Sequence, residues 1–359
     1  MDIAAHAIEP FRQQVLAALG DGRPLRIRGG GTKDWYGQQL EGAILDTRGY
    51  AGIVDYEPTE LVITARCGTP LAEIEAVLAE RNQMLAFEPP HFGANATLGG
   101  AVACGLCGPR RATSGATRDF VLGAKLLDGK GDVLSFGGRV MKNVAGYDVS
   151  RMLAGSLGTL GLILEISLKV LPRPFFETTL RFALSEADAI RHLNEGGGRP
   201  LPLSGSWWCD GVLMLRLSGA EAAVQAARRL LGGDEVPDGG AFWAAVREQR
   251  LPFFAGDAAL WRLSLPSTSG ALSLDGAQAI EWGGAQRWLR AGSDAASAQA
   301  IRRMAADRGG HATLFRGGDK SVGIFHPLAP ALGVIQARMQ SAFDPQRIFN
   351  RGRMYPREA

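Results

Sequence analysis

The hydrophobic and polar positions at the start of the chain predict an amphipathic helix. In the segment A-I-E-P-F-R-Q-Q-V-L-A-A-L-G, residues 7–20, apolar side chains recur at helical spacing at Phe11, Val15, Leu16 and Leu19. Gly20 follows the last of them and predicts the end of the helix. We expect these four side chains to form the face that packs against a core.

Short runs rich in β-branched residues follow and predict strands. They are P-L-R-I-R, A-I-L-D-T-R, G-I-V-D-Y and L-V-I-T-A-R-C. Thr69 and Pro70 then predict the start of a second helix, with Thr69 as the N-cap and Pro70 at the first helical position. The first 82 residues therefore predict one strand, loop, strand and helix unit.

Residues 87–123 show little periodicity, and a long stretch of this kind inside a compact domain is usually functional. The next segment, A-K-L-L-D-G-K-G-D-V-L-S-F, predicts a hairpin, and residues 143–155 predict a helix. The run T-L-G-L-I-L-E-I-S-L-K-V-L predicts a long alternating strand. Two prolines in L-P-R-P end it and predict a domain boundary near residue 174.

Beyond residue 174 the pattern predicts two successive βαβ-type halves. The first contains a strand at 178–184, helices at 185–195 and near 220–231, and a strand or hairpin between them. The second contains the strands L-W-R-L-S-L-P, Q-A-I-E-W, Q-R-W-L-R and H-A-T-L-F, with a helix near 295–308. Such halves suggest an antiparallel sheet with helices on one face. The turn-rich tail F-D-P-Q-R-I-F-N-R-G-R-M-Y-P does not predict a domain of its own.

The bulk composition narrows the class of protein. The chain has 359 residues, of which 46% are hydrophobic and 21% charged, as in ordinary globular proteins. The net charge of +3 comes from dispersed basic residues, which argues against nucleic-acid binding. Neither a signal peptide nor an apolar run long enough to span a membrane is found, and only four cysteines occur. We expect a cytoplasmic protein that reaches a membrane only through partner subunits.

Glycine is the outlier, with 48 residues that cluster in loops at 29–31, 93–108, 115–161 and 309–318. The segment R-I-R-G-G-G-T-K, residues 26–33, contains three consecutive glycines whose amides could all face one anion, and phosphate is the commonest such ligand. Taken alone, the same segment also fits an ordinary turn. Both interpretations stay open on the residues alone.

Several generic motifs are excluded or weak. G-K-G-D lacks the spacing of a P-loop, and G-S-L-G-T-L-G precedes a predicted strand, whereas the dinucleotide fingerprint precedes a helix. Cys104 and Cys107 form a single C-x-x-C pair, for which a packing role is favoured over a redox or metal role. The five histidines show no metal-ligand spacing. His91 and His311 lie in loops and are weak candidates for a general base. We expect no metal site.

Three segments taken together resemble the vanillyl-alcohol-oxidase (PCMH-type) family of FAD-binding domains. They are R-G-G-G-T-K, E-P-P-H-F-G-A-N-A-T-L-G-G-A-V-A-C-G, and the stretch from K-N-V-A-G-Y-D to L-K-V-L-P-R-P. Within that family, nearly the whole chain resembles the FAD-binding subunit of bacterial glycolate oxidase. The marks of this resemblance include P-T-E-L-V-I-T-A-R-C-G-T-P-L, M-K-N-V-A-G-Y-D, E-W-G-G-A-Q-R-W-L, G-G-H-A-T and D-P-Q-R-I-F-N-R-G-R-M.

The resemblance implies an α+β protein made of a PCMH-type, two-subdomain FAD-binding domain and a smaller, ferredoxin-like α+β cap domain. The implied domains are residues 1–174 for FAD, 175–340 for the cap, and a tail, 341–359, that returns to the FAD domain. In this family the first glycine loop wraps the FAD pyrophosphate. The implied residues there are Gly29, Gly30, Gly31, Thr32 and Lys33.

Further cofactor contacts are implied along the rest of the FAD. Thr97, Gly99, Gly100, Gly105 and Gly108 would lie along the pyrophosphate and isoalloxazine, where a Cβ atom would collide with the cofactor. The remaining contacts implied by the resemblance are Gly115, Thr117, Gly161 and Ile163.

The chain departs from its relatives in three ways. The pyrophosphate loop has no His or Cys for a covalent link, so we expect non-covalent FAD. The tail reads N-R-G where relatives commonly have N-P-G, and we still expect it to return to the FAD domain. The paired-histidine and glutamate metal motif of full-length D-2-hydroxyacid dehydrogenases is not found in the cap, which is also shorter.

The third departure leaves the catalytic residues unidentified. Oxidation of a 2-hydroxy acid needs a base for the hydroxyl proton and a cation for the carboxylate, and the sequence offers no convincing pair. The resemblance implies an FAD-dependent oxidoreductase subunit of a complex that oxidises glycolate to glyoxylate. A second flavin subunit and an iron-sulfur subunit, which would take the electrons, are its implied partners. The alternatives are a flavin-fold assembly subunit without turnover and a stand-alone FAD-dependent 2-hydroxyacid dehydrogenase.

Overall fold

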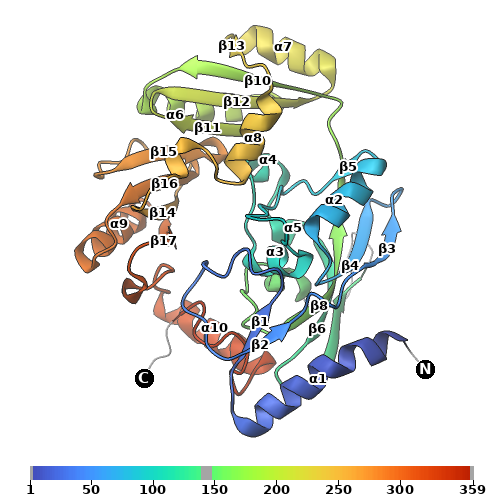
Figure 1. Cartoon of the computed structure of the whole chain (residues 1–359). Helices are drawn as coiled ribbons and strands as arrows, with labels where there is room; N and C mark the ends of the chain where they lie inside the picture. Colours follow the sequence, from blue (N-terminus) through green and yellow to red (C-terminus); the bar gives the residue numbers. More distant parts are fainter. Residues whose placement is uncertain (1–2, 139–147, 356–359) are drawn as a thin grey trace.

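The computed structural model describes residues 3–138 and 148–355. Two large antiparallel sheets organise this part of the chain, one of five strands and one of eight, and they lie in different regions of the molecule (Figure 1). A parallel pair and a short two-stranded pair accompany the five-stranded sheet. Residues 143–147 of the helix predicted at 143–155 lie outside the described residues, and the described part, 148–155, contains only a 3-10 turn, Ser150–Leu153.

The five-stranded sheet has the order β3-β4-β8-β6-β7. Its strands are β3 (Ile53–Glu57), β4 (Val62–Arg66), β8 (Leu162–Lys169), β6 (Val121–Leu127) and β7 (Val133–Gly137). Strand β8 occupies the middle of the order, and nearly all its side chains are buried on both faces. The alternation predicted for this segment therefore does not give one solvent-exposed face and one buried face.

Helix α1 (Ile3–Asp21) packs beside the parallel pair β1 (Leu25–Arg28) and β2 (Ala43–Asp46). The prediction of its buried face is right for Phe11 and Val15 and wrong for Leu16, which is 36% exposed. The face that packs is made by Ile8, Phe11, Val15 and Ala18. Leu16 comes directly after Val15, so its side chain points away from the face that packs against this core.

Helix α2 (Leu71–Glu80) begins one residue later than predicted, and its N-cap position is Pro70. The Thr69 hydroxyl does not cap the helix. It donates to the Arg66 carbonyl at 2.7 Å and accepts from the Gly52 amide at 2.9 Å. Thr69 thus fastens the turn after β4 to the loop before β3, and the prediction that it caps the helix is wrong.

The stretch from 87 to 123 contains three short helices that its weak periodicity did not predict. They are α3 (Leu98–Cys104), α4 (Arg111–Ser114) and α5 (Thr117–Phe120). Helix α3 is capped by the Thr97 hydroxyl, which accepts from the Gly100 amide, and it ends at Gly105 in a left-handed conformation. Helices of four to seven residues are too short to show a full amphipathic pattern, so the sequence gives little signal for them.

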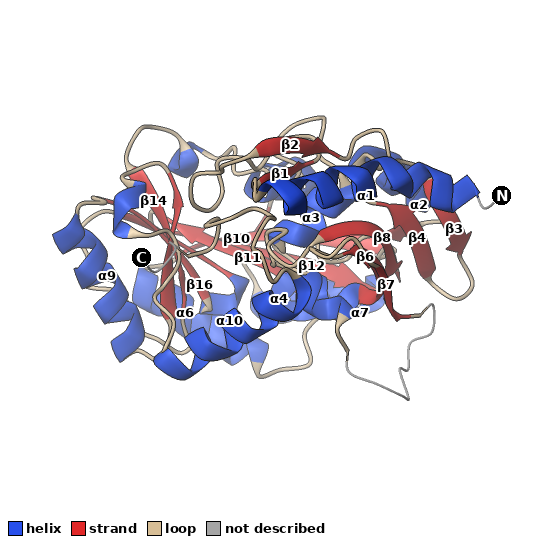
Figure 2. Cartoon of the chain, turned by 90° about the horizontal axis from the view of Figure 1, so that it is seen from below, coloured by secondary structure: helices blue, strands red, loops and turns tan. Residues whose placement is uncertain are grey.

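The eight-stranded sheet has the order β13-β10-β12-β11-β15-β16-β14-β17 and is antiparallel throughout, as predicted. Its strands are β10 (Phe176–Ala183), β11 (Leu203–Cys209), β12 (Val212–Gly219), β13 (Asp234–Glu235), β14 (Ala259–Ser264), β15 (Ala277–Glu281), β16 (Gln286–Ala291) and β17 (His311–Arg316). Together with the five-stranded sheet, this gives the expected α+β architecture (Figure 2).

Helices α6 (Glu186–Gly197), α7 (Glu221–Leu231) and α9 (Ala295–Asp307) cover one face of this sheet. Helix α8 (Gly239–Arg247), which was not predicted, packs on the opposite face with Trp207 and Trp288. Helix α10 (Pro330–Phe343) was also not predicted. It crosses the boundary expected at residue 340, and the division of the chain into domains stays a prediction. The remaining strands are β5 (Gln83–Met84) and β9 (Leu171–Pro172).

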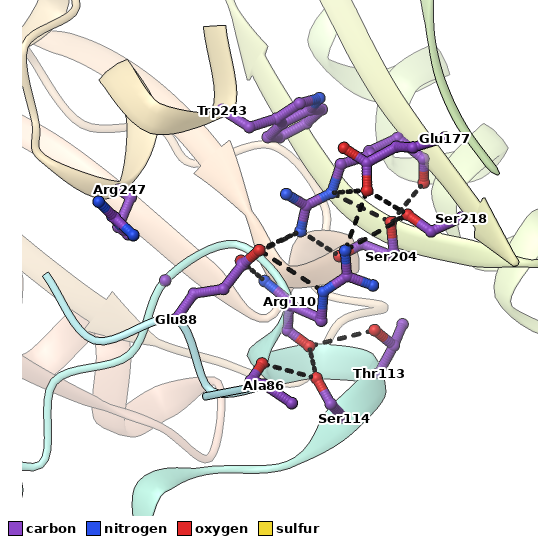
Figure 3. Close-up of polar contacts among 12 residues, drawn as sticks. Ala86, Glu88, Arg110, Thr113, Ser114, Glu177, Ser204, Ser218, Trp243 and Arg247 are labelled. Carbon is purple, nitrogen blue, oxygen red and sulfur yellow. Dashed lines mark hydrogen bonds and ion pairs between the residues drawn. The ribbon is translucent and has the colours of Figure 1, made fainter. Parts of the chain in front are cut away.

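A network of ion pairs joins the segment before α4 to the eight-stranded sheet (Figure 3). Glu88 lies between two guanidinium groups, at 2.9 Å from Arg216 and 3.5 Å from Arg110. Arg110 also contacts Glu177 at 3.0 Å, and Arg216 lies over the Trp243 ring. Because these charges are largely buried and mutually paired, they fix the sheet relative to the loop 104–110.

Candidate cofactor-binding site

A cleft runs beside β1 and α3 and encloses about 670 Å³ of space, counted to its open mouth. Segments far apart in the sequence form its walls. They are the loop after β1, the start of α3, the turn that leads into β8, and the C-terminal tail. The lining residues are Ile27, Arg28, Gly29, Gly30, Gly31, Thr32, Lys33, Asp34, Thr47, Cys67, Thr97, Gly99, Gly100, Ala103, Cys104, Leu157, Gly158, Gly161, Leu162, Ile163, Asn350 and Arg353.

The loop 29–33 presents unused hydrogen-bond donors to this cleft. The β1–β2 ladder ends at Arg28, and none of the five following backbone N–H groups donates to another residue that the structure describes. Gly31 has a φ of +73°, a conformation that glycine adopts readily. Successive amides without partners make a concave site that fits an anion such as phosphate.

The glycines allow close approach between protein segments, which differs from the reason we expected. A Cβ at Gly30 would lie 1.5 Å from the Asn95 carbonyl oxygen, and one at Gly99 would lie 2.6 Å from the Cys67 Cβ. A Cβ at Gly108 would lie 2.6 Å from the Glu88 carbonyl oxygen. Contacts between protein segments therefore require glycine at these positions, and the expected collision with the cofactor stays a prediction.

Two buried cations line the same cleft. Lys33 is 6% exposed, and its ammonium donates to the His91 carbonyl at 3.2 Å. Arg353 is also 6% exposed and donates to the carbonyls of Lys33 and Tyr36, while its Nε has no partner in the described chain. Burial lowers the pKa of both groups. An anion in the cleft would offset the cost of burying these charges.

The C-terminal tail holds two walls of the cleft together. Asn350 accepts a hydrogen bond from the Ile27 amide at 2.8 Å and donates to the Leu157 carbonyl at 2.6 Å. Its backbone amide donates to the Leu25 carbonyl at 2.9 Å. Asn350 has a φ of +38°, which asparagine tolerates better than most residues. The tail thus contacts the cleft through this residue, although N-R-G replaces N-P-G.

Most, but not all, of the predicted cofactor residues meet in this cleft. Those that line it are Gly29, Gly30, Gly31, Thr32, Lys33, Thr97, Gly99, Gly100, Gly161 and Ile163. The structure does not place Gly105, Gly108, Gly115 and Thr117 among the lining residues. Thr117 is buried and contacts the Cys107 sulfur at 3.2 Å, while Gly105 ends α3. The tail residues Asn350 and Arg353 also line the cleft. They were not among the predicted contacts, although the tail that contains them was expected to return to the FAD domain.

A second, smaller pocket of about 310 Å³ adjoins the loop 106–108. Its walls include Gly108, Arg262, Glu281, Gln286 and Trp288. Glu281 Oε2 accepts from the Trp288 indole at 2.6 Å and from the Gln286 amide at 2.9 Å. The ladder between β15 (Ala277–Glu281) and β16 explains this contact, since Glu281 lies opposite Gln286 and Trp288 follows on the same face. These residues belong to the motif E-W-G-G-A-Q-R-W-L, which carries part of the family resemblance and for which no role was predicted.

Burial raises the pKa of Glu281 to about 7. Nearby Glu88 raises this pKa further, whereas the Trp288 and Gln286 hydrogen bonds and the charge of Arg262 lower it.

The raised pKa of Glu281 makes the stability of the protein depend on pH. A carboxyl group whose pKa is higher in the folded than in the unfolded protein destabilises the fold as the pH rises from the unfolded pKa to the folded pKa. The free energy of unfolding of Glu281→Gln, compared with that of the unmodified chain, should therefore be about 2 kcal/mol higher at pH 8 than at pH 5. Urea unfolding at both pH values measures this difference, and a constant difference would contradict it.

The histidines and cysteines show no further centre. His91 lies beside Glu75 at 3.2 Å, outside the residues that line the cleft, and His311 stacks near His326. No group of three or more His, Cys, Asp or Glu within residues 3–138 and 148–355 could hold a metal ion. All four cysteines are free thiols. No helix among the described residues is long and apolar enough to cross a membrane.

Comparison with known proteins agrees with this geometry. A family described as "FAD binding domain" matches residues 4–137. Glycolate oxidase subunit GlcE of Escherichia coli is 51% identical over 343 residues, which cover 96% of each chain. Glycolate oxidase subunit GlcD of Bacillus subtilis is 32% identical over 138 residues, or 38% of this chain and 29% of that protein.

A solved structure of alkyldihydroxyacetonephosphate synthase superposes with a TM-score of 0.66 over 97% of this chain and 75% of that one. At 14% identity it shows a shared fold alone, the PCMH-type fold. The cleft, the FAD binding domain and the FAD-linked oxidoreductases among its relatives identify FAD as the cofactor and the chain as an oxidoreductase. Since the similarity to GlcE extends over nearly its whole length, the chain belongs to the family of glycolate oxidase subunit GlcE.

Proposed function

We propose that this chain binds FAD non-covalently in the cleft and serves in a multi-subunit glycolate oxidase that converts glycolate to glyoxylate. In this proposal a second flavin subunit and an iron-sulfur subunit complete the complex, and the iron-sulfur subunit receives the electrons. The observation that carries the proposal is the loop 29–33, which lines a cleft with two buried cations and whose amides have no hydrogen-bond partner in the described chain. The name of the relative that matches over 96% of both chains supplies the substrate and the complex.

The residues of the cleft fit FAD at its phosphate end. The amides of residues 29–33 would hold the pyrophosphate, with Lys33 and Arg353 placed to balance its charge. Thr97 and Gly100 would border it from the start of α3, and Gly161 and Ile163 from the start of β8. When bound, FAD supplies a two-electron acceptor that the amino acids themselves lack. The chain provides binding, orientation and electrostatic balance.

The chemistry of the lining thiols favours non-covalent attachment. Cys67 and Cys104 line the cleft, so a thioether link to the flavin is sterically conceivable. Burial raises the pKa of Cys67 to about 12 and also raises that of Cys104. The thiolate is the nucleophilic form of cysteine, so both side chains are poor nucleophiles at neutral pH.

Acid precipitation tests this mode of attachment. The purified chain should show two flavin absorption bands between about 300 and 550 nm, and all the colour should move to the supernatant because no covalent bond retains it. Cys104→Ser should release its flavin in the same way. Flavin that stays with the precipitated unmodified chain, but not with Cys104→Ser, would contradict the proposal.

Reconstitution with the partner subunits tests the assigned reaction. The complex containing this chain should oxidise glycolate with an artificial electron acceptor, and omission of this chain should remove that activity. A complex that keeps full activity with a chain unable to bind FAD would identify an assembly subunit. Glycolate oxidation by the isolated chain would instead identify a stand-alone dehydrogenase.

A further inference from the structure

The pocket that contains Glu281 also contains a cation without a carboxylate partner. Arg262, on β14, lines the pocket, and its guanidinium donates to the Tyr36 hydroxyl at 3.2 Å. It lies over the Phe315 ring at 5.3 Å. Among the described residues Arg262 forms no ion pair with an acidic side chain, unlike Arg110 and Arg216 close by. A largely enclosed guanidinium that lacks an anion can accept one from a ligand.

The carboxyl group of Glu281 has one oxygen engaged and one free. Oε2 receives both hydrogen bonds from β16, and Oε1 has no hydrogen-bond partner in the part of the chain that the structure describes. These two bonds fix the orientation of the carboxyl group in the pocket wall. The pocket therefore offers a fixed cation and an unused acceptor, the pair that the sequence alone did not reveal.

This pocket adjoins the proposed FAD cleft. Cys104 lines the cleft, while Leu106, Cys107 and Gly108, a few residues later in the same loop, line the pocket. Tyr36 provides a second link, because its hydroxyl binds Arg262 and its carbonyl accepts from Arg353 in the cleft. A ligand in the pocket would thus lie near the end of the cleft that Cys104 lines.

We propose that this pocket binds a small 2-hydroxy carboxylate, with Arg262 paired to the carboxylate and Glu281 Oε1 accepting a hydrogen bond from the neighbouring hydroxyl. The proposal rests on the proposed function for the choice of ligand and adds to it a site on this chain. The space of about 310 Å³ includes the open mouth of the pocket, so only a compact molecule would enter it. Trp288, Gln286 and Tyr36 are positioning residues, since they orient the two charged groups.

Binding of oxamate to the FAD-loaded chain tests the site without turnover. Oxamate carries a carboxylate and an adjacent amide N–H donor, and it has no α-hydrogen to lose. Calorimetry should show binding by the unmodified chain, and Arg262→Met should weaken it roughly 10- to 100-fold through loss of a charged hydrogen bond. Arg262→Lys should fall between the two. The surface variant Arg229→Met, on the outer helix α7, should bind as the unmodified chain does.

The pH profile separates a direct contact from a structural one. Oxamate affinity of the unmodified chain should rise as the pH increases through about 7, because the ionised Glu281 is the better acceptor. The charged groups that face Glu281 or share its pocket are Arg262, Glu88 and Arg247. Glu281→Gln should remove this rise while the protein stays folded, as judged by circular dichroism and FAD content.

The outcomes distinguish this site from the function on which it rests. No oxamate binding by the unmodified chain, or equal affinity in Arg262→Met, would overturn the pocket assignment. A complex with Arg262→Met that oxidises glycolate with unchanged KM and kcat would overturn it as well, and would leave the proposed function intact. Conversely, an unmodified complex inactive on glycolate, together with Arg262-dependent oxamate binding, would overturn the function and keep the site.

Discussion

Gly30→Ala is expected to leave the purified protein almost free of FAD. The new Cβ would lie 1.5 Å from the Asn95 carbonyl oxygen, a distance that no local adjustment of a side chain can relieve. The backbone at residue 30 or at Asn95 must therefore shift, and either shift changes the wall of the cleft, which residues 29–33 and Thr97 form. Loss of two hydrogen bonds to a charged phosphate, at about 1.5–3 kcal/mol each, lowers the affinity at least roughly 100-fold. Flavin content after gel filtration and titration with added FAD measure the effect.

The control for this variant is Gly49→Ala. A Cβ at Gly49 meets no atom within 4 Å, and Gly49 does not have the positive φ that disfavours alanine. It should keep the FAD content of the unmodified chain, which shows that glycine replacement near β2 is harmless as such. A folded Gly30→Ala protein with full flavin content would show that the cofactor does not depend on the loop 29–33.

The glycine loop also shows how far the sequence could predict the site. The three consecutive glycines alone left an ordinary turn open, and the phosphate-binding loop was implied by the resemblance that they carry together with the later segments. Ten of the fourteen residues implied in this way line one cleft. The reason for the glycines could not be read in the same way. Gly30 and Gly99 are required by Asn95 and Cys67, and these contacts exist only after the chain has folded.

The pocket around Glu281 could not be predicted from the sequence, for a related reason. Glu281 and Trp288 come from one hairpin and could be paired from the sequence, but Arg262 joins them only because β14 lies beside β16 in the sheet. The pocket closes when the loop containing Gly108 is brought against this sheet. Strand order and contacts between distant segments carry no local signature, whereas the strands themselves do. The pattern of hydrophobic and polar residues therefore predicted the strands, but it did not predict the pocket that forms where the strands meet.

Asn350→Ala is expected to lower both the stability of the protein and its affinity for FAD. The side chain is 2% exposed and satisfies the Ile27 amide and the Leu157 carbonyl, which belong to two walls of the cleft. Without it both backbone groups are left buried and unpaired, at a cost of about 1–3 kcal/mol each. We expect the free energy of unfolding to fall by about 2–5 kcal/mol, measured by urea denaturation.

The change in FAD affinity should accompany that loss, because Ile27 leads into the loop 29–33 and Leu157 precedes Gly158 and Gly161 in the cleft wall. Gln346→Ala, an exposed position in the same tail, is the matched control and should change neither quantity. If Asn350→Ala lost stability but bound FAD with unchanged affinity, the tail would only support the fold. If both fell together, Asn350 would hold Ile27 and Leu157, from two walls of the cleft, in the arrangement that binds the cofactor.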